Sequence, residues 1–400
     1  MERGSWKVQV RVTGKQGAAE MEVPLPAVAT HSAKMNAPLG ALLGVLGLAL
    51  VAGMVGIIGA ANRDARLEPG DAPSPTQKKR ALVLMACATV LLIVVVVAAN
   101  KWWSVDASAN ARLNYKLPQM QVSLAAGNVL DLQLDNPNAL EKIIDSDQLN
   151  RMNRAGFKVP DALRLDDLIP DHGHLLHLFL VRMPDMQSFW HLHPDETGVA
   201  QFADKLPTLP AGHYQLYADI VHSTGFPETQ VATIDLPAVT GSALTGDDSG
   251  VPNLAAVSDV AQLSDGYRMV WERDGGAAKS PATFKAGDPV WFRFRVEDPN
   301  GKPAELENYM GMPGHAAFIS DDGKVFAHLH PAGSVSMAAV ALAENGESQP
   351  AGMSGMHQEP PTGEVSFPYG FPQAGDYRIF VQVKRAGHVE TGVFTARVEP

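Results

Sequence analysis

The chain has 400 residues, a formal net charge of −11 and a single cysteine. Its length predicts two or three domains. One cysteine excludes a disulfide scaffold, a cysteine-based zinc site and a CxxC redox pair. Acidic residues outnumber basic residues by 43 to 32, so a protein that neutralises nucleic-acid phosphates is not expected. The unusual feature is the number of histidines, which is thirteen.

Residues 1–35 predict the end of a β domain followed by a linker. The run from Gly4 to Val10 is similar to a strand near the end of each repeated domain described below. The segment GAAEMEVPLP that follows is similar to ETQVATIDLP in the first of those domains. We expect the remnant of a preceding β-sandwich domain, its last two strands, with Met1 as an internal methionine of a longer reading frame. The alternative is a short β-hairpin arm.

Two uncharged apolar blocks follow, at residues 36–61 and 81–100. Each is long enough to cross a hydrocarbon core of about 30 Å as a helix, and buried soluble helices are seldom apolar on every face. Residues 62–80 carry five cations, which predicts a cytoplasmic loop by the positive-inside tendency. We therefore expect a two-span transmembrane hairpin in the bacterial inner (cytoplasmic) membrane, with the large C-terminal part outside, in the periplasm.

The rest of the chain contains an internal repeat. Three runs return in the same order at similar spacing: AGNVLDLQLDNPN as AGDPVWFRFRVEDPN, FWHLHP as FAHLHP, and AGHYQLYADIV as AGDYRIFVQVK. Three ordered matches indicate a duplicated domain. We place the two copies at residues 105–240 and 255–400, joined by a linker rich in Gly, Ser and Asp at residues 241–254.

Short runs of alternating apolar residues, bounded by turn signals, predict strands in each copy. About seven strands per copy imply an antiparallel β-sandwich. The predicted fold class is mainly β: two tandem Ig-like antiparallel β-sandwich domains anchored by a two-helix transmembrane hairpin. Within the copies only Leu140 to Arg154 has helical spacing, in a loop that the second copy lacks.

The candidate metal ligands are side chains at corresponding positions of the two copies. In chain order they are His172, His174, His177, His191 and His193, matched by Met310, Met312, His315, His328 and His330. The last two histidines of each set stand two residues apart on a strand, so both project to one face. Further donors in the second copy are Met337, Met353, Met356 and His357.

Thioethers select Cu(I), whereas imidazole suits Cu(II), zinc and other ions. We predict a metal site in each copy, with copper ahead of zinc. Cu(I) is expected in the second copy, which carries the methionines, and Cu(II) in the first. The alternative is that the histidines brace a turn before proline, since duplication copies bracing residues too. His213, His222 and His388 have no counterpart in the other copy and are interpreted as surface residues.

The residues from His172 to Asp219, with the runs HLF, FWHLHP, GHY and YAD in order, resemble the YtkA-like/FixH-like group of bacterial envelope domains. The resemblance covers both copies and extends to the N-terminal remnant, but not to the two apolar blocks. It implies an Ig-like β-sandwich associated with copper handling and oxidase maturation. It also implies that the characteristic positions of the first copy are His172, His177, His191 and His193. The second copy departs from the pattern at Met310.

These features predict a membrane-anchored periplasmic or extracellular metal-binding protein. Its expected role is copper handling, as a chaperone, a sensor, a resistance component or a factor in metalloenzyme maturation, with a copper-receiving enzyme as partner. The alternative is a structural or accessory subunit of a respiratory or copper-enzyme membrane complex, with structural histidines. An enzyme is not expected, because the sequence has no nucleophile–base arrangement, phosphate loop or HExxH motif.

Overall fold

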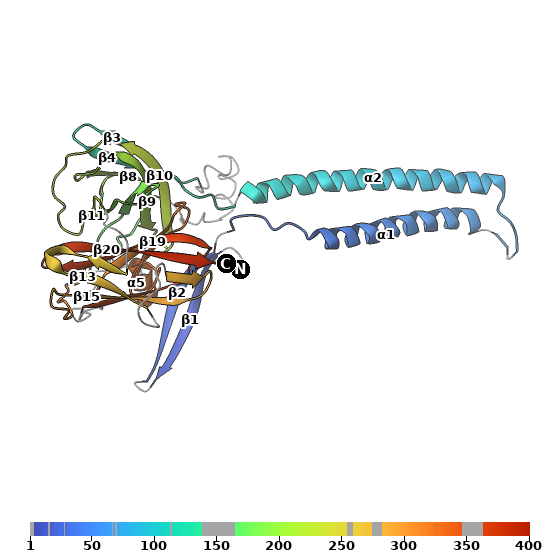
Figure 1. Cartoon of the computed structure of the whole chain (residues 1–400). Helices are drawn as coiled ribbons and strands as arrows, with labels where there is room; N and C mark the ends of the chain where they lie inside the picture. Colours follow the sequence, from blue (N-terminus) through green and yellow to red (C-terminus); the bar gives the residue numbers. More distant parts are fainter. Residues whose placement is uncertain are drawn as a thin grey trace. The chain divides into compact units, whose positions relative to one another are not determined.

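The computed structural model describes residues 4–14, 17–27, 29–65, 67–68, 70–112, 114–137, 165–253, 259–273, 282–345 and 363–400 (Figure 1). The chain forms two compact units. One is the segment Val28–Lys116, and the other combines Arg3–Ala27 with Leu117–Pro400. Both predicted sandwich copies belong to the second unit, apart from residues 105–116 of the first copy, which lie in the first unit.

The first unit is a pair of long helices, α1 (Ala37–Asp64) and α2 (Pro75–Arg112). Both are long and apolar enough to cross a membrane. Among their described residues, only Gly59 and Ala81 are buried. Gly59 lies against the Met85 side chain so closely that a Cβ at this position would overlap the sulfur. Because exposed apolar surface of this extent is unfavourable in water, the pair is consistent with a membrane anchor.

The helices are longer than the predicted spans. α1 continues to Asp64 and α2 begins at Pro75, so the connection between them is shorter than the predicted loop at residues 62–80. α2 also continues to Arg112, since no glycine or proline follows its apolar block until Pro118. The predicted start of the first sandwich copy at residue 105 is therefore wrong, because residues 105–112 are helical.

The N-terminal segment forms an antiparallel hairpin of β1 (Gly4–Gly14) and β2 (Gly17–Ala27). The predicted pair of strands is confirmed. A two-stranded hairpin is marginally stable alone. Here β2 lies beside α5 (Met337–Asn345), a helix of the second sandwich copy.

The first copy is a β-sandwich of two antiparallel sheets, with strand orders β10-β9-β5-β6-β11 and β3-β4-β8-β7. The strands are β3 (Gln121–Ala125), β4 (Val129–Gln133), β5 (His177–Met183), β6 (Phe189–Leu192), β7 (Asp195–Gly198), β8 (Gln201–Lys205), β9 (Gly212–Val221), β10 (Pro227–Leu236) and β11 (Ser249–Val251). β11 comes from the predicted linker at residues 241–254 and pairs with β6, so part of that linker belongs to the first copy.

The second copy repeats this architecture, with sheets β14-β20-β19-β16-β17 and β12-β13-β15-β18, except that β14 pairs with β20 in parallel. Its strands are β12 (Val260–Gln262), β13 (Arg268–Glu272), β14 (Ala282–Lys285), β15 (Val290–Glu297), β16 (His315–Ser320), β17 (Phe326–Leu329), β18 (Glu364–Tyr369), β19 (Gly375–Arg385) and β20 (His388–Glu399). The helix α5 follows β17 and was not predicted. The predicted helix from Leu140 to Arg154 lies outside the described residues, as do Met353, Met356 and His357.

One side-chain contact is typical of Ig-like sandwiches and occurs in both copies. The hydroxyl of Tyr214 donates a hydrogen bond to the carbonyl of Pro210 at 2.7 Å. The hydroxyl of Tyr377 donates to the carbonyl of Gln373 at 2.9 Å. Both tyrosines are buried near the start of a long strand, where such a tyrosine fastens the strand to the preceding corner. The predicted Ig-like fold class is confirmed.

The five-stranded sheets of the two copies pack against each other through an apolar cluster. Its buried members are Phe179, Val181, Met186, Phe189 and Tyr217 from the first copy, and Ala317, Ile319, Phe380 and Val393 from the second. Each copy also has a separate core between its own two sheets. The copies are therefore joined by a hydrophobic interface and not only by the chain between them.

His222 is buried, so its interpretation as a surface residue is wrong, whereas His213 and His388 are exposed as expected. The Nδ1 atom of His222 lies 2.8 Å from Asp167 Oδ1, and its Nε2 atom lies 3.8 Å from Glu228 Oε2. Burial alone lowers the pKa of His222, but the two carboxylates outweigh burial and raise the pKa to about 9. The sequence shows no partner for this histidine because both carboxylates come from other segments of the fold.

We expect the sandwich unit to lose about 3 kcal/mol of stability as the pH rises through 9. The unfolded pKa of histidine is about 6.5, so the contribution of His222 is complete below pH 6.5 and is lost as the pH passes its folded pKa of about 9. Urea unfolding across this range measures the effect. His222→Gln should remove the pH dependence and His213→Gln should retain it, and an equal slope in both variants contradicts the assignment.

Candidate metal centre

The first histidine cluster contains His177, His191 and His193, whose ligand nitrogens all lie within 4.8 Å of one another. His177 begins β5, His191 is in β6, and His193 follows β6. The antiparallel register of β5 and β6 places Leu178 opposite Leu192, which brings His177 beside His193. The closest nitrogens are His177 Nδ1 and His191 Nε2, 3.1 Å apart. The predicted projection of both strand histidines to one face is confirmed.

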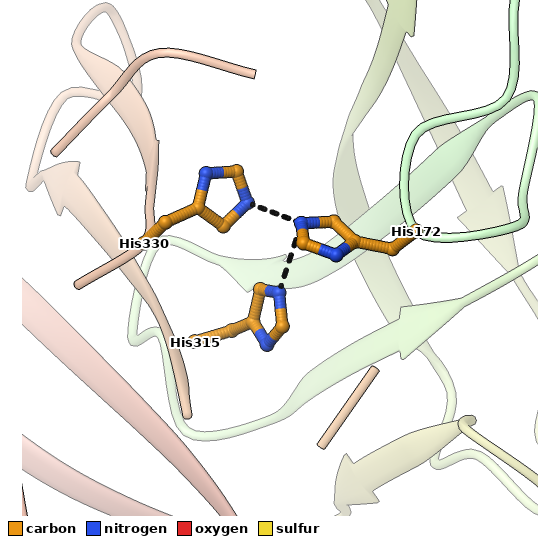
Figure 2. A group of neighbouring side chains, drawn as sticks. All are labelled: His172, His315 and His330. Atoms are coloured by element: carbon orange, nitrogen blue, oxygen red, sulfur yellow. Dashed lines mark hydrogen bonds between the residues drawn. The ribbon is translucent and has the colours of Figure 1, made fainter. Parts of the chain in front are cut away.

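The second cluster takes its residues from both copies (Figure 2). His315 begins β16 and His330 follows β17, whereas His172 comes from a tight turn of the first copy. The Nε2 atom of His172 lies 3.1 Å from His330 Nε2 and 3.5 Å from His315 Nε2. Grouping His172 with the other histidines of its own copy is therefore wrong, because the turn carries its side chain across the interface.

Five of the six clustered rings also have a hydrogen-bond acceptor on the side away from the cluster. These are the carbonyl of Asp171 for His177 Nε2 (3.0 Å), the Gln382 side-chain oxygen for His191 Nδ1 (2.9 Å), the Asp248 carboxylate for His193 Nδ1 (3.0 Å), the carbonyl of Met310 for His172 Nδ1 (2.9 Å) and the carbonyl of Val335 for His330 Nδ1 (3.1 Å). Because these oxygens only accept, each ring donates its outer N–H. Metal-binding histidines are oriented in the same way.

The inner nitrogens then face one another as acceptors. With its outer nitrogen protonated, a neutral imidazole carries a lone pair on the other nitrogen. Two such lone pairs meet at 3.1 Å between His177 and His191, and again at 3.1 Å between His172 and His330. They repel unless a cation, either a proton or a metal ion, lies with them. Nitrogens that share one tetrahedral ion at 2.0–2.1 Å lie about 3.3 Å apart, which is close to this spacing.

Protonation is an unfavourable way to relieve this repulsion. Burial lowers the pKa of His177, His191, His315 and His330 well below the usual value, and the neighbouring imidazoles lower it further. The rings are therefore neutral at pH 7. A metal ion relieves the repulsion without protonating any ring, because it accepts both lone pairs.

His328 lies between the clusters. Its ring centroid is 4.6 Å from that of His330 and 5.3 Å from that of His177. Its Nδ1 atom lies 3.1 Å from Asp219 Oδ2, and its Nε2 atom is buried without a hydrogen-bond partner among the described residues. Burial lowers the pKa of His328 to about 3. A neutral ring with one unpaired nitrogen is a further candidate ligand.

His174 lies at the edge of the first cluster that solvent reaches. Its ring stacks on that of His193 with centroids 4.0 Å apart. The His174 side chain is 31% exposed, as is that of Asp247, whose Oδ2 atom lies 3.5 Å from His174 Nε2. A partly exposed imidazole and carboxylate therefore lie beside the buried cluster.

The structure brings the eight predicted histidines of the two copies together at one interface, and Met310 and Met312 are both buried. The residues that orient the rings were not predicted. Asp219 and Gln382 serve His328 and His191 in this way. Asp219 and Gln382 are the ninth residues of the repeated runs AGHYQLYADIV and AGDYRIFVQVK. This correspondence was the signal in the sequence that could have identified them as equivalent partners.

Residues 271–400 match a family model described as Domain of unknown function (DUF8832), and no curated protein matches the chain. Similar solved structures include a titin fragment, at 8% identity over 71% of this chain and 93% of that chain, with a TM-score of 0.15. The FN1-FN3 domains of chicken CNTN1 match at 9% identity over 71% of this chain and 68% of that chain, with a TM-score of 0.17.

Proposed function

We propose that this protein is a membrane-anchored copper-binding protein that holds ions between its two sandwich copies. Each three-histidine cluster binds one ion and passes it to a partner by ligand exchange. Zinc is the alternative ion, since imidazole suits both metals. The observation that carries the proposal is the pair of facing nitrogen lone pairs in each cluster, 3.1 Å apart.

Structural histidines account less well for this arrangement. A histidine that braces a fold pairs each buried nitrogen with a partner. Here His193 Nε2 and His328 Nε2 are buried with no partner among the described residues. Each such atom costs about 1–3 kcal/mol. A bound ion offsets this cost by accepting nitrogen lone pairs.

The charge of the chain supports a cationic cargo. Residues 101–400 carry 37 acidic and 22 basic residues, a net charge of −15. This field attracts cations and repels anionic ligands. The partly exposed pair of His174 and Asp247 lies where a cation would first meet the cluster. Exchange from this edge to His193, on which His174 stacks, is the expected route of loading and release.

The anchor and the resemblance of the sandwich copies support a location and a partner. Two apolar helices with five cations at residues 62–80, between their apolar blocks, are consistent with two spans of a bacterial inner membrane, which leaves the copies in the periplasm. The resemblance to YtkA-like/FixH-like domains supports copper as the cargo. It also supports a copper-receiving enzyme, or a membrane complex that contains one, as the recipient.

Metal titration of the full-length protein in detergent micelles tests the proposal. The wild type should bind two ions per chain, and the double variant His191→Ala, His193→Ala should bind one. The matched control His213→Ala, His388→Ala removes two exposed histidines and should still bind two. Two ions in the first variant would overturn the site assignment. No ion in the wild type would favour the alternative role, an accessory subunit with structural histidines.

A further inference from the structure

The two copies meet through contacts that are made twice, once in each direction. Phe189 of the first copy stacks on Phe380 of the second, with ring centroids 4.1 Å apart and planes at 10°. Phe326 of the second copy stacks on Tyr217 of the first, at 4.4 Å and 10°. Phe189 corresponds to Phe326 in the repeat, and Tyr217 corresponds to Phe380. The interface therefore has local two-fold symmetry.

The ring-orienting hydrogen bonds follow the same symmetry. His191 of the first copy lies 2.9 Å from the side-chain oxygen of Gln382 in the second. His328 of the second copy lies 3.1 Å from the carboxylate of Asp219 in the first. His191 corresponds to His328, and Asp219 corresponds to Gln382. The symmetry thus holds among the histidines themselves as well as in the apolar part of the interface.

The turns that carry His172 and Met310 have the same conformation. Each is a two-residue turn closed by reciprocal backbone hydrogen bonds, between Asp171 and His174 and between Tyr309 and Met312. The φ angle is 52° at His172 and 49° at Met310, and the glycine after each has a φ angle of 91° or 79°. Such turns require positive φ at both central residues, which explains the glycines. The two side chains therefore leave equivalent backbones.

The symmetry predicts where the Met310 side chain acts. His172 crosses from the first copy to His315 and His330 of the second. His315 corresponds to His177 in the repeat, and His330 corresponds to His193. The symmetry therefore predicts that the Met310 side chain lies beside His177 and His193 of the first copy. Met310 is 7% exposed, and its carbonyl accepts a hydrogen bond from His172 Nδ1 at 2.9 Å. The Met310 backbone therefore lies beside the histidines at the interface of the two copies.

We propose that the Met310 thioether is a ligand of the first cluster, with His177, His191 and His193. This inference rests on the proposed function. By the same symmetry, His328 is the fourth ligand of the second cluster. A thioether among imidazoles favours Cu(I), whereas four imidazoles suit Cu(II) or zinc. The expected metal preferences are then the reverse of the sequence prediction: Cu(I) at the first cluster and Cu(II) or zinc at the second. The reason is that each turn contributes its side chain to the histidines of the other copy.

Competition titrations of the full-length protein in detergent, with Cu(I) against a chromogenic Cu(I) chelator and separately with Zn(II), test the inference. Met310→Leu should weaken Cu(I) binding at one of two sites by at least about tenfold, since even indirect partners of a metal ligand change affinity by 10- to 100-fold. Zn(II) affinity should change much less. X-ray absorption of the Cu(I)-loaded protein should lose its sulfur scattering in this variant.

Met186→Leu is the matched control, because Met186 is 3% exposed in the same interface and belongs to its apolar cluster. It should leave Cu(I) affinity unchanged. Met310→His should make the first cluster resemble the second, with weaker Cu(I) and stronger Zn(II) binding. If Met310→Leu binds two Cu(I) ions with wild-type affinity, this inference is overturned and the proposed function is left intact. Absence of metal binding by the wild type overturns both.

Discussion

Removal of bound metal is expected to lower the free energy of unfolding of the sandwich unit by about 5–8 kcal/mol. A ligand that binds only the folded state stabilises it by about 2.7 kcal/mol at 100 times Kd and about 4.1 kcal/mol at 1,000 times Kd, and two clusters contribute here. The ligands of each cluster converge only in the folded state. Urea unfolding of the full-length protein in micelles, followed by near-ultraviolet circular dichroism with and without a chelator, measures the difference.

The variant His172→Ala separates the two clusters. Among the described residues, His172 is the one ligand of the second cluster that comes from the first copy. Its loss should therefore remove about half of the metal-dependent stabilisation, or about 3–4 kcal/mol, and leave the first cluster filled. The control His213→Ala removes an exposed histidine that pairs with the exposed Asp235, and it should retain the full effect. A chelator effect of equal size in wild type and His172→Ala would show that the second cluster holds no ion.

Much of the centre was predictable because a strand has a fixed side-chain period. The spacing of two residues between His191 and His193 places both rings on one face, and the structure has their centroids 4.6 Å apart. His328 and His330 repeat this at 4.6 Å. The duplication was predictable because it preserved runs of sequence, and the fold class followed from the strand patterns.

The interface between the two copies could not be predicted from the side-chain period of a strand. In β5 the residues from His177 to Val181 are all buried, so neither face of this strand is left to solvent. One face lies in the core of its own sandwich, with Leu178 and Leu180, and the other lies in the interface, with Phe179 and Val181. An apolar run of this kind indicates that both faces are covered but does not say what covers the second face. His172 joins the second cluster only because the second copy covers this face, so its place could not be predicted from the sequence.

Phe189→Ala is expected to destabilise the sandwich unit by about 3–5 kcal/mol and to weaken metal binding at the second cluster. Phe189 is fully buried and stacks on Phe380 across the interface. Its removal leaves a cavity between the copies, which costs the transfer free energy of the ring and the lost packing. Because His172 reaches His315 and His330 only while the copies stay in register, a looser interface should separate these ligands.

Phe292→Ala distinguishes this effect from a general loss of stability. Phe292 is also fully buried, but it belongs to the core between the two sheets of the second copy. Its substitution should cost a similar 3–5 kcal/mol or so. Metal affinity, measured without denaturant where both variants remain folded, should fall in Phe189→Ala and stay near wild type in Phe292→Ala. An equal fall in the two variants would mean that metal binding follows overall stability, and that the interface has no particular part in holding the ligands together.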